Sequence, residues 1–193
     1  MAARTNSADP RAERVRTRLR DAAFALAGER PVDEFTVSDI VVRAGVSRQV
    51  FYQHFRDRDD AVATAFTVAF ASATADIGGD PSARILRLFD FASEHHAMYR
   101  NIFPSAVSQR AAAAFRAELT PACEEIAARG MPIVTTFATL TAESVTRFLV
   151  GGFMEVLRSW MEDPDSTDLC TRVSGALDTV NALLRIPAAV HQH

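Results

Sequence analysis

Residues 36–55, with the sequence TVSDIVVRAGVSRQVFYQHF, contain two short helix-like segments on either side of Gly45. Thr36, with Asp39 three residues later, forms the capping-box pattern that begins a helix. Gly45 tolerates the left-handed conformation that ends a helix, and Ser47 is a typical N-cap for the next one. We therefore predict two short helices joined by a glycine turn. The buried face of the first is predicted to consist of Val37, Ile40, Val41 and Ala44.

The second segment carries apolar and hydrogen-bonding side chains on opposite sides. Phe51 and Phe55 are four residues apart, so they share one helix face and are expected to pack inward. Arg48 lies in the first turn, where it can point along the helix axis. Two short helices of which the second exposes polar groups describe a helix-turn-helix, with an ordinary helical hairpin as the alternative. The side chains expected on the outer side are Gln49, Val50, Tyr52 and Gln53.

An amphipathic helix is predicted upstream of this pair, beginning near Ala12 and closed by Gly28 and Pro31. The arginines at positions 14, 16, 18 and 20 lie largely off its apolar stripe. Residues 1–10 are polar and are expected to form a flexible arm. The apolar stripe consists of Val15, Leu19, Ala22, Ala23 and Leu26.

The rest of the chain also has helical periodicity and no strand signal, so the predicted fold class is all-α. The fold would comprise an N-terminal three-helix domain containing the helix-turn-helix, followed by a C-terminal helical domain. Breaks are expected at Pro104, at Pro121 and at the Gly130-Met131-Pro132 step. The longer helices are predicted over residues 57–75, 81–103, 134–162 and 167–185.

Charge is distributed unevenly along the chain, although the net charge of −3 does not by itself favour nucleic acid. Residues 1–58 hold 11 Arg and 8 acidic residues, whereas residues 59–193 hold 10 Arg and 16 acidic residues. The segment Arg4–Arg20 alone contains six Arg and two acidic residues, and all 21 basic residues of the chain are Arg. A basic end on an acidic body is typical of a protein that binds a polyanion at that end.

Several classes of protein are not indicated. No apolar run approaches the roughly 18–20 residues that a membrane span needs, and the start of the chain lacks the apolar core of a signal peptide. Cys123 and Cys170 stand apart from any Cys/His cluster and are expected to stay reduced, so the cytoplasm is the predicted compartment. The P-loop, GxSxG and GxGxxG motifs are absent. We therefore predict neither an enzyme nor a bound cofactor.

The segment DFASEHH leaves one chemical alternative open, a metal-responsive helical protein. It places four metal-ligand residue types within one predicted helix. It lacks the Glu-x-x-His spacing of di-iron bundles and the HExxH motif of zinc proteases, so no metal site is predicted. The residues of this alternative are Asp90, Glu94, His95 and His96.

The longer segment TVSDIVVRAGVSRQVFYQHFRDRDD resembles the DNA-binding signature of the TetR family of transcriptional regulators. The resemblance covers residues 12–62, while the remaining chain is similar only in length and all-helical layout. It implies a DNA-binding regulator whose partners are a double-stranded operator, a second copy of the chain and a small-molecule effector. The matched positions include the Ala44-Gly45-Val46-Ser47 turn, Phe51-Tyr52, His54-Phe55 and Arg58.

The resemblance and side-chain chemistry together assign the DNA-binding roles. Arg48 and Gln49 match positions that usually meet base edges, where Arg can pair with guanine and Gln with adenine. Val50 stands where the family often has Thr, and its methyl groups could contact a thymine methyl. Alternatives remain: the Tyr52 ring could pack on the following helix, and Arg11, Arg14 and Arg18 could form a plain solvated face. The other DNA-binding candidates are Thr36, Ser38, Ser47, Tyr52, His54 and Arg58.

In the family the last two long helices pair two subunits, which implies a near-palindromic operator. Here these helices would span about 134–162 and 167–185, and two adjacent glycines would permit close approach. Alternatively, their apolar stripes complete the core of a single subunit. The dimer-interface candidates are Gly151, Gly152, Trp160, Leu169, Val173, Leu177, Val180 and Leu184.

The family also implies a ligand cavity in the C-terminal domain, and repression that ends when the ligand binds. The predicted division is therefore a flexible arm (1–10), a DNA-binding domain (11–56), an effector-binding and dimerisation domain (57–187) and a tail (188–193). A constitutive or protein-controlled regulator is the alternative, and each candidate could instead belong to the core or to a surface ion pair. The effector candidates, chosen by helix phase and residue type, are Phe66, Phe89, His96, Tyr99, Phe103, Phe115, Phe137, Glu143, Arg147 and Phe148.

Overall fold

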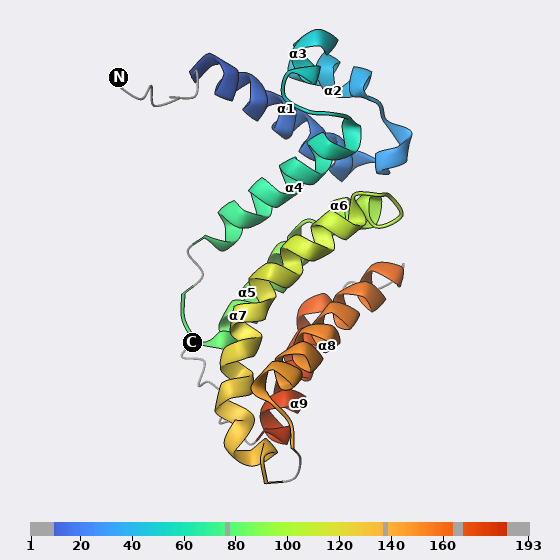
Figure 1. The fold of residues 1–193 in the computed structure, drawn as a ribbon. Helices are drawn as coiled ribbons and strands as arrows, with labels where there is room; N and C mark the ends of the chain where they lie inside the picture. Colours follow the sequence, from blue (N-terminus) through green and yellow to red (C-terminus); the bar gives the residue numbers. More distant parts are fainter. Residues whose placement is uncertain (1–9, 76–77, 137–138, 164–167, 185–193) are drawn as a thin grey trace, which may run out of the picture. The chain divides into compact units, whose positions relative to one another are not determined.

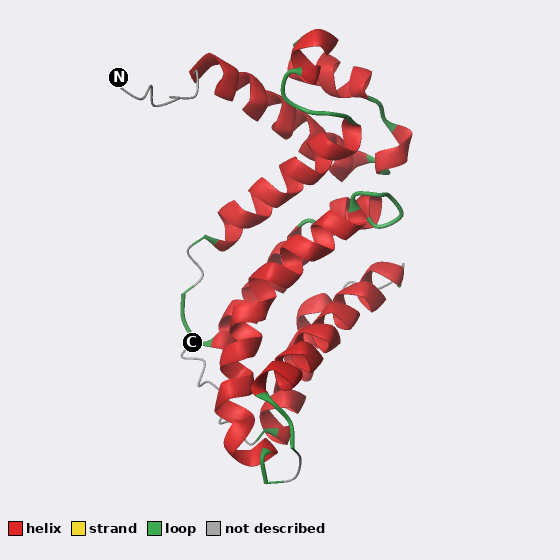
Figure 2. Ribbon diagram, viewed as in Figure 1, coloured by secondary structure: helices red, strands yellow, loops and turns green. Residues whose placement is uncertain are grey.

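The structure is a computed structural model that describes residues 10–75, 78–136, 139–163 and 168–184. Within these residues every regular element is a helix, which confirms the predicted all-α class (Figure 2). None of the described helices is long and apolar enough to cross a membrane. The elements, labelled in Figure 1, are α1 (Pro10–Glu29), η1 (Val32–Glu34), α2 (Val37–Ala44), α3 (Arg48–Tyr52), α4 (Arg58–Thr74), α5 (Pro81–Glu94), α6 (His96–Ile102), α7 (Ser108–Val134), α8 (Ala142–Glu162) and α9 (Leu169–Leu183).

The chain separates into two compact units. Unit 1 runs up to Val68 and also includes Ala97–Ser108, whereas unit 2 consists of Ala69–His96 and the residues from Gln109 onward. Both α4 and α6 therefore contribute residues to each unit. The domain boundary predicted at residue 56 separates a DNA-binding from an effector-binding function, and it stays a prediction.

Unit 1 is built on the buried face of α1. Leu19 and Ala23 are fully inaccessible to solvent, and α1 packs against α2. The Arg43 guanidinium also donates to both carboxylate oxygens of Glu29, at 2.9 and 2.6 Å. Because this ion pair is exposed, water and salt screen it, and the buried apolar side chains contribute most of the stability.

The helix-turn-helix forms as its local sequence predicts. Thr36 and Asp39 form a reciprocal capping box at the start of α2. Gly45 ends α2 in the left-handed conformation, with φ of 64°, and its N–H donates to the Val42 carbonyl at 3.2 Å. Ser47 then caps α3 by accepting a hydrogen bond from the backbone N–H of the third helical residue, at 3.3 Å. All three predictions of helix boundaries are confirmed.

The core of unit 2 is aromatic. The Phe115 ring stacks on Phe70 at 5.4 Å between centroids and meets Phe89 edge-on at 5.0 Å. The ring centroid of Phe89 also lies 6.2 Å from that of Phe153 on α8. Each fully buried phenylalanine contributes about 1.5–3 kcal/mol to folding. The α9 helix packs against α5 and α8 and completes this core.

The single helix predicted over residues 81–103 is wrong at its centre, because the chain forms α5 and α6 instead. His95 ends α5 with φ of −107° and ψ of 29°. Its ring stacks on Phe91 at 4.2 Å, and its Nδ1 lies 2.9 Å from the Phe91 carbonyl oxygen. These contacts of the His95 ring accompany the local departure from helical geometry, although histidine does not usually break a helix.

The α7 helix continues through Pro121 and Pro132, where breaks were predicted. A proline inside a helix removes one N–H donor and its ring crowds the carbonyl one turn earlier, so packing must offset this cost at Pro121; Pro132 lies in the last turn, where little helix remains to be disrupted. Around Pro121 the buried residues Leu119, Ala122 and Cys123 hold the helix against the core. Tertiary packing therefore overrides the local preference.

The helix predicted over residues 134–162 is wrong at its start, because α7 ends at Val134 and α8 begins at Ala142. Thr141 caps α8 by accepting a hydrogen bond from the Ser144 N–H at 3.2 Å. The Thr-x-x-Ser pattern of this cap is present in the sequence. Because apolar periodicity continues on both sides of it, a single helix was predicted instead.

Candidate nucleic-acid interface

The α3 helix buries one side and exposes the other. Phe51 and Phe55 are buried, with ring centroids 5.8 Å apart. Tyr52 is 59% exposed, and its ring meets Phe51 edge-on at 5.3 Å. Arg48 and Gln49, in the first turn, are also exposed. Arg48, Gln49 and Tyr52 therefore form one accessible surface, which we call the α3 face.

Arg48 is oriented by a residue of α2. One of its terminal nitrogens donates a hydrogen bond to the Ser38 hydroxyl, and the guanidinium has no carboxylate partner among the described residues. A guanidinium has five N–H donors, so most of them remain available to a ligand. The Ser38 contact thus restricts the conformation of the Arg48 side chain and leaves most of its N–H donors available.

Val42 belongs to the same surface and was missed by the sequence reasoning. It lies one turn after Ser38 on α2 and is 80% exposed. A rotation of about 100° per residue puts both side chains away from the buried Ile40, and this signal was present in the sequence. Val42 therefore adds an apolar contact point beside the α3 face.

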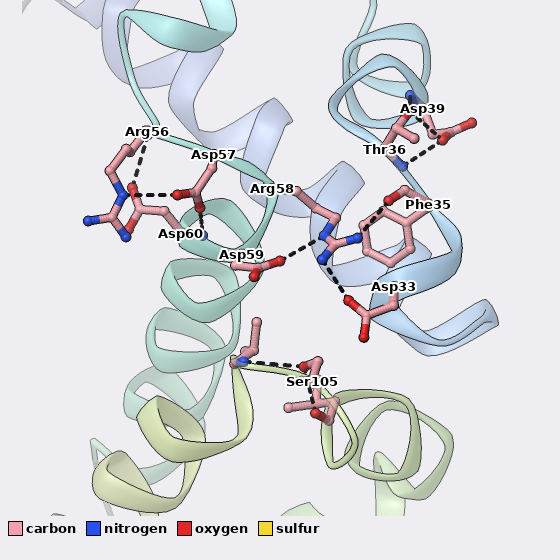
Figure 3. A network of polar contacts seen from close by, with 12 residues as sticks. Asp33, Phe35, Thr36, Asp39, Arg56, Asp57, Arg58, Asp59, Asp60 and Ser105 are labelled. Carbon is pink, nitrogen blue, oxygen red and sulfur yellow. Dashed lines mark hydrogen bonds and ion pairs between the residues drawn. The ribbon is translucent and has the colours of Figure 1, made fainter.

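Thr36 and Ser47 have structural roles as helix caps. The Thr36 hydroxyl and backbone N–H both donate to the Asp39 carboxylate, at 2.8 and 2.7 Å (Figure 3). These hydrogen bonds, the backbone one first, hold the pKa of Asp39 below its ordinary value. Both capping residues are exposed, so the caps stabilise the helices at the surface where DNA contacts were predicted.

Arg58 is engaged within unit 1 (Figure 3). Its guanidinium donates to the carboxylates of Asp33 and Asp59, both at 2.7 Å, and to the Phe35 carbonyl at 3.2 Å. The side chain is only 23% exposed. Arg58 therefore connects the start of α4 to η1, and a phosphate would have to compete with two carboxylates for it.

The remaining candidates of this surface are less exposed. Val50 and His54 are half-buried. The structure therefore brings Ser38, Arg48 and the other residues of the α3 face together on one surface, with Val50 and His54 beside them.

The aromatic residues predicted for an effector pocket are mostly core residues. Phe89 and Phe115 are fully buried in unit 2, and Phe66 meets Tyr99 edge-on at 5.4 Å in unit 1. No hydrogen-bond partner of the buried Tyr99 hydroxyl occurs in the described part of the chain, and burial raises the pKa of this group. These rings are therefore packed in the cores of their units.

The other effector candidates differ in position. Glu143 and Arg147 form an exposed ion pair on α8 at 2.5 Å, and Phe148 beside them is 75% exposed. His96 is half-buried, with its ring 4.7 Å from Trp160, and Phe103 is half-buried in unit 1. Phe137 lies outside the described residues.

Unit 2 contains a half-open pocket of about 210 Å³ between α4, α5 and α7. Arg84 donates to Glu125 through a terminal nitrogen, while its buried Nε has no hydrogen-bond partner within the described ranges. The pocket therefore contains one buried N–H donor, the Arg84 Nε, beside polar and apolar side chains. None of its lining residues was among the predicted effector contacts, because the pocket combines residues of three helices. The lining residues are Thr74, Arg84, Leu88, Glu118, Pro121 and Ala122.

The dimer candidates divide into buried and exposed residues. Trp160, Leu169, Val173 and Leu177 are buried within unit 2, as the single-subunit alternative expected. Val180 and Leu184 are half-buried, whereas Gly151 and Gly152 are exposed on α8.

The metal alternative finds no support in the described residues. No group of three or more His, Cys, Asp and Glu is close enough there to hold a metal ion. Asp90 instead accepts a hydrogen bond from the Cys170 thiol at 3.2 Å. Cys123 is buried, and burial raises the pKa of its thiol to about 12.

A short helix with a phenylalanine core, an outer face of Arg, Gln and Tyr, and a preceding glycine turn defines a helix-turn-helix DNA-binding domain. Residues 19–63 match the family model of the bacterial regulatory proteins of the tetR family. The helix-turn-helix region of this chain is thus that of the TetR family of transcriptional regulators.

Solved structures share the fold of this chain. The dihydroxyacetone kinase operon activator DhaS has a TM-score of 0.64 at 18% identity, covering 91% of this chain and 98% of that one. The regulator FadR from Bacillus subtilis, in complex with stearoyl-CoA, has a TM-score of 0.61 at 15% identity, covering 85% and 96%. A tetR-family regulator from Streptomyces coelicolor has a TM-score of 0.59 at 20% identity, covering 87% and 83%. Comparison with the curated proteins gives no match.

Proposed function

We propose that this protein is a cytoplasmic repressor that binds a near-palindromic DNA operator as a homodimer and leaves it when a small molecule binds unit 2. The α3 face carries this proposal, because Arg48, Gln49 and Tyr52 are exposed on a helix anchored by buried phenylalanines. Such a surface suits the major groove of DNA, where donor and acceptor patterns differ between base pairs.

Base reading is assigned to the first turn of α3. Arg48 can donate two hydrogen bonds to guanine, and Gln49 can pair with adenine, each pair giving about 1–3 kcal/mol of discrimination. The half-buried Val50 offers methyl groups to a thymine methyl. Tyr52 and His54 are assigned to phosphates, which position the helix without reading sequence.

The homodimer is assigned to the outer surface of α8 and α9. Phe148 and Leu183 are 75% and 70% exposed, although both are large and apolar. Gly151 and Gly152 follow Phe148 by three and four residues, so they lie on the same side of α8 and permit close approach. Covering these side chains with a second copy would present two equal recognition helices, which is why the operator is expected to be near-palindromic.

The effector is assigned to the pocket between α4, α5 and α7. Its volume of about 210 Å³ is below the roughly 300–1,000 Å³ typical of small-molecule sites, which favours a small ligand. The buried Arg84 Nε favours a ligand that carries a hydrogen-bond acceptor. The Bacillus subtilis relative holds stearoyl-CoA, and this supports a ligand-binding role in general.

Release from DNA is proposed to pass along α4. Thr74 at the end of α4 lines the pocket, while Arg58 at its start bonds to η1 of unit 1. A ligand shifts the equilibrium between two conformations only by its difference in affinity for them. The effector must therefore bind the DNA-free form more tightly.

A genomic selection tests operator binding. Sheared genomic DNA retained by the purified protein at moderate salt is sequenced, and a near-palindromic motif should be enriched. Arg48→Ala and Gln49→Ala should each weaken the motif, whereas Arg116→Ala, an exposed arginine of unit 2, should preserve it. Salt-sensitive retention without any motif would contradict base reading by the α3 face.

Sedimentation tests the dimer surface. Phe148→Glu should yield monomers, because it adds a charge to the proposed apolar contact. Leu140→Glu alters another exposed apolar residue, located before α8, and should remain dimeric. A wild-type protein that is monomeric at high concentration would exclude the homodimer.

A constitutive or protein-controlled regulator is the second candidate. The rings of Phe66, Phe89 and Phe115 favour it, because they are buried in the core where an aromatic-lined cavity was expected. Thermal-shift screening of small metabolites distinguishes the two candidates. A compound that stabilises the wild type but not Arg84→Met, and that releases DNA, supports the effector site.

A further inference from the structure

Many arginines among the described residues pair with carboxylates, but Arg14, Arg16 and Arg18 in the first half of α1 do not. Arg20 pairs with Glu13 at 3.3 Å, for example, and the α2, α4, α5, α7 and α8 helices all carry paired arginines. Arg14, Arg16 and Arg18 are exposed and form neither an ion pair nor a side-chain hydrogen bond within the described parts of the chain. Their charges are therefore available to a partner.

Two of these arginines lie on one side of the helix. Arg14 and Arg18 are four residues apart, so their Cα atoms are separated by about 6 Å along the helix axis and their side chains emerge in nearly the same direction. Arg16 is rotated by about 200° from Arg14 and points away from this pair. We call Arg14 and Arg18 the α1 pair.

Nearby carboxylates do not neutralise the α1 pair. Glu13 is already bonded to Arg20 on another side of the helix. Asp21, one turn after Arg18, is exposed and forms no ion pair with it. No carboxylate within the described residues pairs with the α1 pair, so both guanidinium groups can bind a ligand.

The α1 pair lies just before the buried residues of its helix. Leu19, Ala22 and Ala23 are buried and anchor the second half of α1 in unit 1, and Arg18 directly precedes them. Figure 1 shows the start of α1 at the same end of unit 1 as α3. A partner that occupies the α3 face would thus extend towards the α1 pair.

We infer that the α1 pair is a second DNA contact, which binds phosphates outside the segment that the α3 face reads. The inference rests on the proposed operator binding and extends it. Phosphates of one strand follow each other by about 3.4 Å along the duplex axis, so two long side chains about 6 Å apart can reach neighbouring phosphates. This contact adds affinity for any DNA sequence and no discrimination between sequences.

The salt dependence of binding tests this contact. Each phosphate that a protein neutralises contributes about 0.9 to the slope of log affinity against log salt. The double variant Arg14→Ala with Arg18→Ala should therefore lower the slope by about 1.8 for each bound subunit on a random-sequence DNA duplex. The corresponding double lysine variant should keep the wild-type slope, because a phosphate contact needs only the charge.

A matched control separates a local contact from net charge. Arg87 and Arg116 in unit 2 are also exposed without an ion pair among the described residues. Changing both to Ala removes the same two charges and should leave the slope unchanged. An equal loss of slope in this control would overturn the inference, since net charge would then explain the effect.

Failure of the inference differs from failure of the proposed function. If the double alanine variant on α1 keeps the wild-type slope while the genomic selection still yields a motif, the α1 pair is only a solvated face, and the proposed operator binding by the α3 face is supported. If the wild type yields no motif, the proposed operator binding itself is wrong. Circular dichroism checks that the variants fold, which is expected because Ala favours helices and both sites are exposed.

Discussion

Arg58 and Asp33, 25 residues apart in sequence, form an ion pair at 2.7 Å that connects the start of α4 to η1. Arg58 also bonds to the Phe35 carbonyl and to Asp59, so three of its donors are used within unit 1. The basic residue that was expected to face DNA is thus part of the framework that holds the DNA-binding domain together.

Replacing Arg58 should therefore reduce stability. Arg58→Ala is expected to lower the free energy of unfolding by about 1–2 kcal/mol, a value reduced by the partial exposure of the pair. Arg58→Lys should lose most of the same stability, because an ammonium cannot reproduce the planar fork. Urea unfolding measures both. Arg56→Ala, which removes a highly exposed ion pair, is the control and should stay near wild type. Normal stability of Arg58→Ala with weakened DNA binding would assign Arg58 to phosphates.

Ser38 should act through Arg48. Ser38→Ala removes the hydroxyl that accepts a hydrogen bond from the Arg48 guanidinium, and the side chain then samples more conformations. We expect a loss of about 1 kcal/mol in operator affinity, roughly fivefold, with unchanged affinity for random DNA. Fluorescence anisotropy with both duplexes measures the two affinities. An equal loss on both would mean that Ser38 contacts the backbone itself.

The Tyr52 hydroxyl can be tested without disturbing the fold. The ring is 59% exposed, so Tyr52→Phe should leave the midpoint of thermal unfolding unchanged. Affinity for DNA should fall by about 1 kcal/mol if the hydroxyl donates to a phosphate. A variant that loses stability and keeps its affinity would show that the hydroxyl has a structural partner.

The capping box predicts a pH dependence of stability. Hydrogen bonds from Thr36 lower the pKa of Asp39 below its ordinary value of 3.8. The folded state therefore favours the ionised carboxylate, whose contribution is complete above pH 3.8 and is lost as the pH falls through the lower folded value. The difference in thermal midpoint between wild type and Asp39→Asn should shrink as the pH drops through this window. A constant difference would exclude this linkage.

The boundaries of the helix-turn-helix could be predicted because local chemistry determines them. A cap at Thr36, a left-handed turn at Gly45 and a cap at Ser47 each depend on residues within a few positions. The inward direction of Phe51 and the outward direction of Tyr52 follow from helical rotation in the same way.

Features that depend on distant residues could not be predicted. The ion pair of Arg58 was not predicted, because its partner Asp33 lies 25 positions away in the sequence. Phe148 was grouped with pocket residues because an aromatic side chain on a periodic stripe usually indicates burial, yet it is 75% exposed. The polar pocket at Arg84 combines three helices, and no single stretch of sequence describes it.

The basic surface of unit 1 contains arginine alone, since the chain has no lysine. A guanidinium stays protonated throughout the physiological pH range, whereas lysine ammonium groups are the usual targets of side-chain acetylation. The attraction of Arg14, Arg18 and Arg48 for a polyanion is thus insensitive to the acetyl transfer that neutralises lysine. Regulation of DNA affinity then depends on ionic strength and on conformational change, and not on chemical removal of these charges.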